Sequence, residues 1–343
     1  MNSKRIGRRT VALQTPPSVL SFANIGGRME GQGPLAKYFD ELCDDSFFGE
    51  KTWEKAEATM QRRVLRRALE QAGLKPGDVD YVLAGDLLNQ CIGSSFGLRE
   101  LGIPFFGLYG ACSTMTEGLL LGGVLTDGGY RPNALCAASS HFSTAERQYR
   151  FPLEMGTTTP PSAQRTATGA GAVLVSGESV PGSPLQHVRL KSATIGRVID
   201  MGITDGSNMG AAMAPAAYDS ICRHLLDTGR APEAYDAIYT GDLGRFGRQM
   251  LLELFEREGL DLSKKHFDCG EILFSPEQGY QCGGSGCGCS AIVLACHVLP
   301  RLEAGSLRRV LFLSTGALLS PLTCNQGESI PGIAHVIELE REA

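Results

Sequence analysis

The chain has 343 residues, of which 43% are hydrophobic and 20% are charged, and its formal net charge is -5. This composition is typical of a protein with a large buried core, and the acidic balance argues against nucleic acid as a partner. We expect no transmembrane helix, because the longest uncharged stretch, residues 278–300, is continuously apolar only in its second half. Eleven cysteines in a chain without an N-terminal apolar signal segment indicate a reducing, cytoplasmic compartment.

One sequence of predicted elements occurs twice in the chain. Residues 65–87 match residues 221–243 at 8 of 23 positions without a gap, and the offset between the copies is 156 residues. Each copy predicts a helix that ends at glycine, a turn with proline, an apolar strand and a loop that carries an aspartate. We therefore interpret the chain as a duplicated α/β unit.

The elements that follow are also predicted in pairs. Cys112 and Cys289 each open a largely apolar helix, and a glycine turn and a strand follow, over residues 134–138 and 310–313. Strand-like runs then close the two halves, which we place at residues 1–178 and 185–343, with a turn-rich connector between them. Alternating elements of this kind predict two mixed sheets covered by helices, with the two cysteine helices buried between the sheets. The predicted fold class is a five-layer α/β/α/β/α arrangement with pseudo-twofold halves.

Several motifs support a resemblance to a known family. The duplicated halves, with a cysteine at the start of a buried helix, resemble the thiolase fold, and Tyr109-Gly-Ala-Cys-Ser-Thr114 resembles the nucleophile segment of its ketoacyl-ACP synthase III branch. Longer phrases resemble the stage V sporulation protein AD family of endospore-forming bacteria. These phrases are residues 51–56, 83–90, 110–114, 139–152, 196–205, 209–217, 283–290 and 315–321.

The resemblance implies a function in sporulation. It implies a protein that binds dipicolinic acid, with or without calcium, and that aids its uptake into the forespore alongside membrane subunits of the same operon. The expected location is then cytoplasmic or peripheral at the forespore inner membrane, and no cofactor is implied. Thiolase folds usually form homodimers, and we expect the uncharged strand 134–138 to be the edge that extends across such a dimer.

Cys112 and Ser113 are candidate site residues. A thiol at a helix N-terminus lies at the positive end of the helix dipole, which favours the thiolate. Cys112 can equally be a small buried core residue. Condensing enzymes of the synthase III branch add a histidine and an asparagine, but residues 240–244 contain neither, and Ser285 stands where the asparagine is expected. We therefore assign no catalytic residue, and acyl transfer from a thioester through Cys112 remains the alternative function.

The remaining candidates would recognise an anion. His141 follows the predicted strand 134–138 near Cys112, and Arg147 and Arg150 share one face of a helical turn. A planar dicarboxylate suits an arginine fork, and Tyr149 or Phe151 could stack on a pyridine ring. Glu146 and Arg150 could instead form a surface ion pair. Arg165 and Arg197 are weaker alternative anion-binding residues.

Two further patterns are interpreted as structural. Asp86 and Asp242 follow the repeated strands and are expected to cap neighbouring helices rather than to catalyse. Cys282, Cys287, Cys289 and Cys296 lack the paired spacing of a zinc site, and the first three lie in or beside a glycine-rich segment. We expect no metal site.

Overall fold

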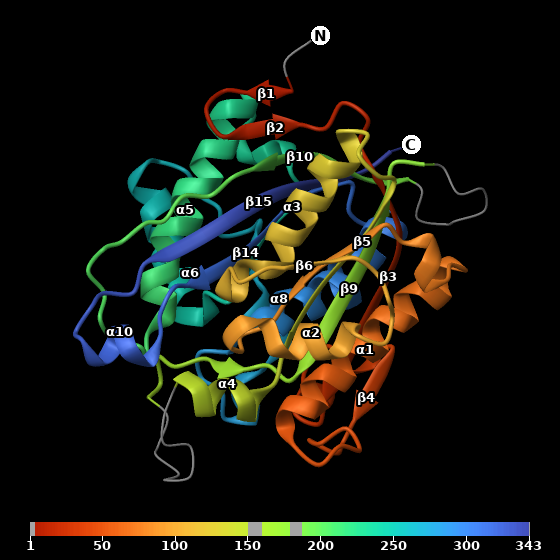
Figure 1. The fold of residues 1–343 in the computed structure, drawn as a ribbon. Coiled ribbons are helices and arrows are strands. Elements are labelled where there is room, and N and C mark those ends of the chain that lie inside the picture. The colour runs from red at the N-terminus through yellow and green to blue at the C-terminus, as the bar shows by residue number, and fades with distance from the viewer. Residues whose placement is uncertain (1–3, 150–159, 179–186, 343) are drawn as a thin grey trace.

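A computed structural model of the protein describes residues 4–149, 160–178 and 187–342 (Figure 1). Ten strands form one hydrogen-bonded path, in the order β12-β11-β14-β15-β10-β3-β9-β7-β5-β6. The path divides into two five-stranded sheets, because β10 and β3 are joined through a single pair of residues, Arg189 and Ser18. Three short strands flank the path, namely β1 (Arg5–Ile6), β2 (Thr10–Ala12) and β4 (Glu41–Cys43).

The two sheets have the same topology. Within each sheet, the three strands nearest the junction are antiparallel to one another, and the outer two continue in parallel. The first sheet contains β3 (Ser18–Gly27), β9 (Gly169–Ser176), β7 (Asn133–Ser140), β5 (Tyr81–Gly85) and β6 (Phe105–Gly107). The second contains β10 (Val188–Thr194), β15 (Gly332–Arg341), β14 (Arg309–Ala317), β11 (Ala237–Gly241) and β12 (His266–Asp268).

The predicted repeat is confirmed element by element. Helix α1 (Trp53–Ala72) and helix α5 (Met209–Thr228) begin and end 156 residues apart, as do β5 and β11. Both helices end at a left-handed glycine, Gly73 with φ 68° and Gly229 with φ 64°. Glycine adopts this conformation without the steric cost that a Cβ atom would add.

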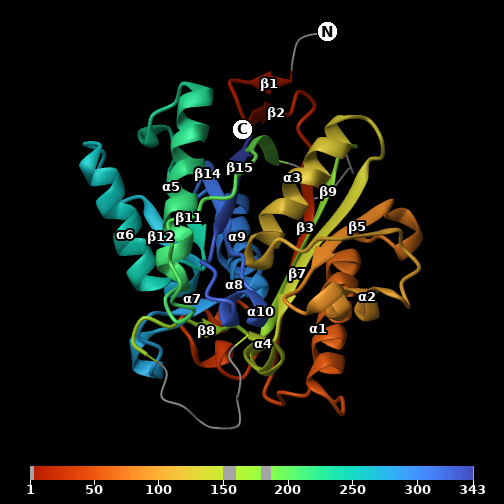
Figure 2. The same ribbon diagram turned by 60° about the vertical axis from the view of Figure 1, so that its left-hand side comes forward.

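Helices separate and cover the two sheets, which gives the predicted five layers (Figure 2). Helix α1 packs on the outer face of the first sheet and α5 on the outer face of the second. Helix α3 (Thr114–Asp127) and helix α8 (Cys287–Val293) lie between the sheets, and α3 contacts strands of both. A π-helical segment, Leu294–Val298, continues α8 into α9 (Leu299–Glu303). The outer layers also include α2 (Ile92–Leu98) and α6 (Gly244–Arg257).

Helix α8 is buried because both of its sides face a sheet, whereas α3 also has an exposed position at Val124. Cys287, Cys289 and the rest of α8 are fully inaccessible to solvent, which explains the run of small and apolar residues. Strands β7 and β9 carry no charge for the same reason, since each is covered on both faces. Within the described ranges, no helix is both long and apolar enough to cross a bilayer.

One expectation about the sheet is wrong. Residues 134–138 belong to β7, which is paired with β5 on one side and with β9 on the other. A strand with both edges hydrogen-bonded cannot extend across a dimer. The outer edge of the first sheet is β6. Strand β7 lacks charged residues because it is buried inside the sheet, and not because it contacts another subunit.

Candidate functional site

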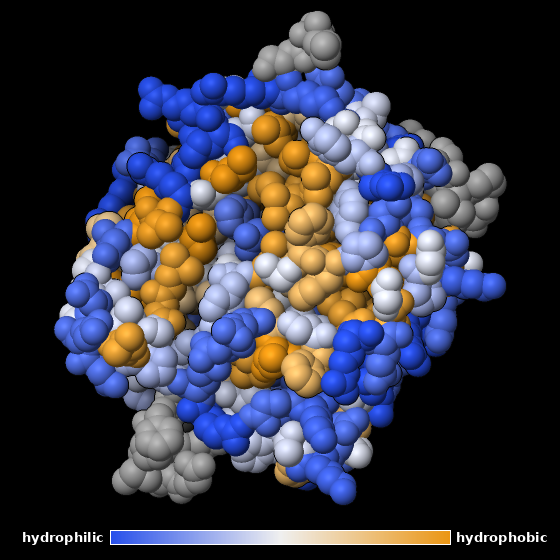
Figure 3. Space-filling view, in the orientation of Figure 1, coloured by the Kyte–Doolittle hydropathy of each residue, from blue (hydrophilic) through white to orange (hydrophobic). Residues whose placement is uncertain are grey.

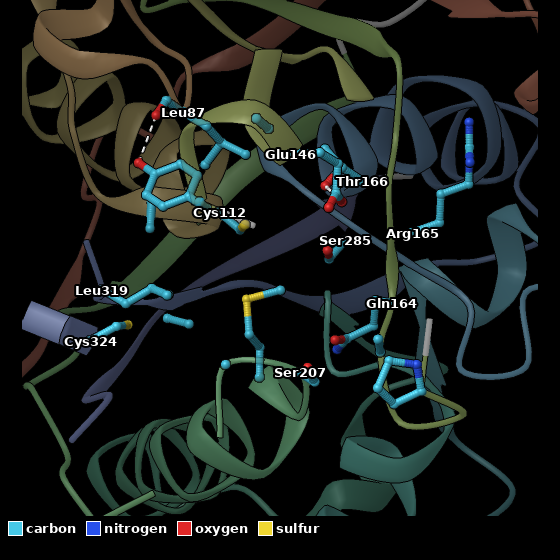
Figure 4. A pocket seen from close by; sticks show the side chains of 18 of the residues that line it. Leu87, Cys112, Glu146, Gln164, Arg165, Thr166, Ser207, Ser285, Leu319 and Cys324 are labelled. Carbon is cyan, nitrogen blue, oxygen red and sulfur yellow. Dashed lines mark hydrogen bonds between the residues drawn. The ribbon is translucent and has the colours of Figure 1, made fainter. Parts of the chain in front are cut away.

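A cavity of about 1020 Å³ opens where the two halves meet (Figure 4). Its walls come from helix α4 (Phe142–Tyr149), the turn that contains Cys112, and segments of the second half around residues 204–209, 279–285 and 317–324. The last of these segments includes the short helix α10 (Pro321–Asn325). Because both halves contribute lining residues, the cavity is a property of the whole chain.

A two-stranded sheet joins the halves at this cavity. Strand β8 (Arg165–Thr166) pairs in parallel with β13 (Gly284–Ser285), so that Thr166 lies opposite Ser285. The chain leaves β13 through Gly286, whose φ is 107°, and a Cβ atom there would lie 2.6 Å from the Oγ of Ser140. The glycine-rich segment is therefore needed for close backbone packing beside the cavity.

Cys112 lines the cavity, as the sequence predicts. It lies in a 3-10 turn, Ala111–Ser113, immediately before α3, and only 7% of its surface is exposed. Ala111 has φ 50°, a conformation that is costly for a residue with a Cβ atom. The Ala111 carbonyl oxygen accepts a hydrogen bond from the thiol of Cys287, at 2.9 Å. The turn thus presents one thiol to the cavity and rests on a second, buried one.

Ser285 also lines the cavity, whereas Ser113 and His141 do not. The hydroxyl of Ser113 donates to the carbonyl of Gly110 at 2.6 Å. The Nε2 atom of His141 is 2.7 Å from the carbonyl oxygen of Ser46, and its Nδ1 accepts from the amide of Ser143. Burial lowers the pKa of His141, so the imidazole is neutral at pH 7 and stabilises the start of α4.

Arg147, one member of the predicted arginine pair, does not line the cavity. Arg147 forms an ion pair with Glu54, and its guanidinium lies 5.3 Å from the ring centre of Trp53, away from the lining residues. Arg150 is outside the described residues. Arg197 forms an ion pair with Asp219 and does not line the cavity either.

Among the described residues, Arg165 is the arginine that lines the cavity. Its guanidinium carbon lies 4.0 Å from the ring centre of Phe142 and 4.7 Å from that of Tyr280, and both aromatic residues also line the cavity. The side chain therefore runs along the wall, and Figure 4 shows it extending away from Cys112. Stacking between two rings holds a guanidinium flat while its N–H groups remain at its edge.

Glu146 is a site residue that the sequence did not predict. Only 6% of its surface is exposed, and its Oε1 accepts a hydrogen bond of 2.9 Å from the hydroxyl of Thr166. The alternative of a surface ion pair between Glu146 and Arg150 involves a residue outside the described ranges. Figure 4 shows Glu146, Thr166 and Ser285 together, at the level of the β8–β13 ladder. The spacing of Glu146 from Tyr149, one helical turn, was the available signal.

Two tyrosines, Tyr109 and Tyr149, form an aromatic part of the cavity wall. The hydroxyl groups of Tyr109 and Tyr149 are 3.1 Å apart, and Tyr149 donates to the carbonyl of Leu87 at 2.7 Å. Burial raises the pKa of Tyr149, so this hydroxyl remains a donor throughout the physiological range. The predicted stacking position of Tyr149 is therefore part of the cavity wall.

The catalytic partners of a condensing enzyme are not at their expected positions. Asp242 follows β11 where a histidine is expected, is fully buried with φ 70°, and does not line the cavity. Burial, together with repulsion from Asp268, raises the pKa of Asp242 well above its ordinary value. No histidine is among the described lining residues. The described lining residues thus include the Cys112 thiol and the Glu146 carboxyl, but not the histidine that activates the nucleophile of a condensing enzyme.

The two repeated aspartates have different surroundings. Asp86 accepts hydrogen bonds from the amides of Leu88 and Ser94, the second of which lies in the first turn of α2, so its predicted capping role is confirmed. Asp242 makes no such contact, and Asp268 instead accepts from the amides of Leu243 and Gly244. Among the described residues, no cluster of three or more His, Cys, Asp or Glu side chains is arranged to hold a metal ion.

Comparisons with known proteins agree with this architecture. The 3-oxoacyl-[acyl-carrier-protein] synthase III from Aquifex aeolicus VF5 has a TM-score of 0.60 at 14% identity, over 94% of this chain and 99% of that chain. Xanthomonas campestris OleA bound with cerulenin has a TM-score of 0.62 at 15% identity, over 95% and 96% of the two chains. AbyA1, a tetronic acid condensing enzyme, has a TM-score of 0.60 at 20% identity, over 94% and 99%. These similarities show the thiolase fold.

The family is shown by sequence. The family model of stage V sporulation protein AD matches residues 7–340. The stage V sporulation protein AD of Bacillus subtilis (strain 168) is 42% identical over 338 residues, which cover 98% of this chain and 98% of the relative. The chain therefore belongs to the stage V sporulation protein AD family.

Proposed function

We propose that this protein binds dipicolinic acid, free or as its calcium chelate, in the cavity between its halves and thereby aids uptake of the compound into the forespore. Membership of a sporulation family supports the setting. The observation that carries the choice of site is the guanidinium of Arg165, held flat between Phe142 and Tyr280 in the cavity wall.

The ligand's chemistry fits these residues. Dipicolinate carries two carboxylates on a planar pyridine ring at neutral pH, and burying an anion without a cationic or hydrogen-bonding partner is costly. Arg165 supplies the cation, and Ser285 and Thr166 supply hydroxyl groups at the β8–β13 ladder. Tyr149 and Tyr280 offer apolar ring faces for the pyridine. Membrane subunits of the same operon are the proposed partners, at the forespore inner membrane.

A pair of matched variants tests the site. Arg165→Gln should weaken dipicolinate binding by about 30-fold or more, because removing one member of a buried charge pair costs about 2–5 kcal/mol. Arg147→Gln, which removes an arginine that lies outside the cavity lining, should bind within about twofold of the parent protein. Isothermal titration with dipicolinate, with and without calcium, measures both. Normal binding by Arg165→Gln alongside lost binding by Arg147→Gln would place the ligand elsewhere.

A second candidate is acyl transfer from a thioester through Cys112. It is favoured by the position of this thiol in the cavity, immediately before α3. It is disfavoured by Asp242 and Ser285, which stand where a condensing enzyme has its histidine and asparagine. Incubation with acyl thioesters followed by intact-mass measurement separates the two functions. We expect no stable adduct on Cys112. An acyl adduct that forms and turns over would favour acyl transfer over dipicolinate binding as the function.

A further inference from the structure

Two carboxyl groups are buried together behind the cavity wall. Glu57 belongs to α1 and Asp86 follows β5, and their exposed fractions are 1% and 0%. Both pack against Gly93, since a Cβ atom at that glycine would lie 3.2 Å from Cγ of Asp86 and 3.3 Å from Cγ of Glu57. This part of the molecule has no role in the proposed contacts with dipicolinate.

The two carboxyls have different sets of donors. Asp86 accepts from the amide of Leu88 at 2.9 Å, and from both the amide and the hydroxyl of Ser94 at 2.7 Å. Glu57 accepts from the hydroxyl of Thr144 at 2.8 Å and from that of Ser139 at 3.3 Å. Asp86 is therefore the better stabilised carboxylate, and Glu57 is the one that holds a proton.

No positive charge compensates the pair among the described residues. The groups that face it are Ser139 on β7, Thr144 on α4, and Ser94 and Gln61 on α2 and α1, all of them neutral. The nearby titratable group is Cys91, whose own pKa is raised to about 11 by burial and by Asp86. Burial and the charge of Asp86 raise the pKa of Glu57 to about 8. A second negative charge therefore appears in this buried space only at alkaline pH.

The two buried carboxyls are linked to two segments of the cavity wall, helix α4 and the loop that contains Leu87. Thr144, which donates to Glu57, lies on α4, and that helix also carries Glu146 and Tyr149. Asp86 is followed directly by Leu87, whose carbonyl accepts the hydroxyl of Tyr149. The Thr144–Glu57 hydrogen bond thus holds α4 against α1, and the Tyr149–Leu87 hydrogen bond holds it against the loop after β5.

We propose that Glu57 is a proton-dependent positioning residue for the cavity: in its protonated form it holds α4 in place, and its ionisation displaces α4 and weakens ligand binding. Strands β5 and β7 are hydrogen-bonded on both sides, and α1 is 20 residues long, whereas α4 has 8 residues and lies outside the sheets. Burial is the first cause of the raised pKa of Glu57. Displacement of α4, which covers this carboxyl through Thr144, is therefore the easiest way for water to reach the ionised group. The effect on the ligand rests on the proposed function.

Ligand binding measured as a function of pH tests whether ionisation of Glu57 weakens binding. Dipicolinate affinity of the parent protein should fall about tenfold between pH 7 and pH 9, since one pH unit beyond the pKa of a required proton costs a factor of ten. Glu57→Gln, which mimics the protonated acid, should bind equally at both values. Glu70→Gln, on the exposed face of the same helix, should fall as the parent does. An equal fall in Glu57→Gln, or a profile that is flattened by Cys112→Ser instead, would overturn the assignment.

A measurement on the unliganded protein tests whether ionisation of Glu57 displaces α4. Trp53 is the chain's one tryptophan, and it lies on α1 beneath the guanidinium of Arg147 on α4, so its fluorescence reports the contact between these helices. The emission of the unliganded parent should change with a midpoint near pH 8, and that of Glu57→Gln should not. A parent protein with unchanged emission would refute the inference. A midpoint near pH 8 without dipicolinate binding at any pH would support it while refuting the proposed function.

Discussion

Arg165 and Arg147 are held in different ways, and the difference decides which of them can bind a ligand. Arg147 is held by a carboxylate, that of Glu54, so its charge is already compensated. Arg165 stacks on two aromatic rings and forms no ion pair with the residues that the structure describes. A guanidinium fixed in this way is ordered and still has charge to offer to an anion.

Cys112→Ser is informative about the thiol. If Cys112 only lines the site, a hydroxyl of similar size should preserve dipicolinate binding to within about threefold, because no buried charge is removed. Isothermal titration of the variant measures this. Lost binding in a variant that unfolds at the parent's temperature would show that the thiol itself is required, and would favour the acyl-transfer alternative.

Asp227 gives a prediction about acid stability. Its carboxylate accepts from the amides of Arg8, Arg9 and Thr10, and hydrogen bonds and the charge of Arg223 lower its pKa to about 2. The stabilisation is complete above its ordinary pKa of about 3.8 and is lost as pH falls towards 2. We therefore expect Asp227→Asn to lower the melting temperature at pH 6, and much less at pH 2, in calorimetric scans. An equal loss at both values would contradict this account.

The site was predicted in part. The position of Cys112 and Ser285 follows from local patterns, a thiol before an apolar helix and a serine in a glycine-rich loop. The position of Arg165 depends on the pairing of β8 with β13, which are distant in the sequence, and no local pattern indicates it. For His141, a nearby backbone carbonyl at Ser46 decides where the ring points, and this contact is also long-range.

Among the elements, the repeated helix and strand are the best determined. Each copy combines an amphipathic helix, a left-handed glycine and an apolar strand, so the local preferences agree with the final fold. The sheet edges were not predictable in the same way. A strand covered on both faces has an apolar sequence whether its edges are paired or free, and this is why β7 was mistaken for an edge.

Helix ends allow a controlled test of this repeat. Gly73→Ala should lower the free energy of unfolding by about 1 kcal/mol, because alanine is strained in the left-handed conformation of φ 68°. Gly77, four residues later, has no positive φ, and neither glycine has a neighbour within 4 Å of an added Cβ atom. Gly77→Ala should therefore be nearly neutral. Urea unfolding measures the change in the free energy of unfolding for both variants. Equal changes would show that the left-handed conformation of Gly73 is not the cause.

At the scale of the whole molecule, β6 is the edge through which two copies could pair. Phe106 on this strand is 54% exposed, and Val124 on α3 and Tyr130 after it are exposed as well. Figure 3 shows apolar surface around α3 and β6. We propose that the protein forms a homodimer along this edge, since an unpaired strand with apolar side chains is a ready pairing surface.

Phe106→Lys should convert such a dimer into a monomer, because two like charges would face each other across the twofold contact. Leu322→Lys, at a leucine on α10 that is 67% exposed, is the matched control and should leave the mass unchanged. Light scattering coupled to gel filtration gives the mass of each. A parent protein that is already monomeric at micromolar concentration would refute the proposal.

The β8–β13 ladder has a consequence for synthesis of the chain. Arg165 and Thr166 are made long before Gly284 and Ser285, yet the wall that they build together needs both strands. A growing polypeptide therefore contains Cys112, Phe142 and Arg165 long before the second strand of this wall has been made. The proposed binding site is therefore complete only after residue 285 has been added, and a product truncated before that point lacks it.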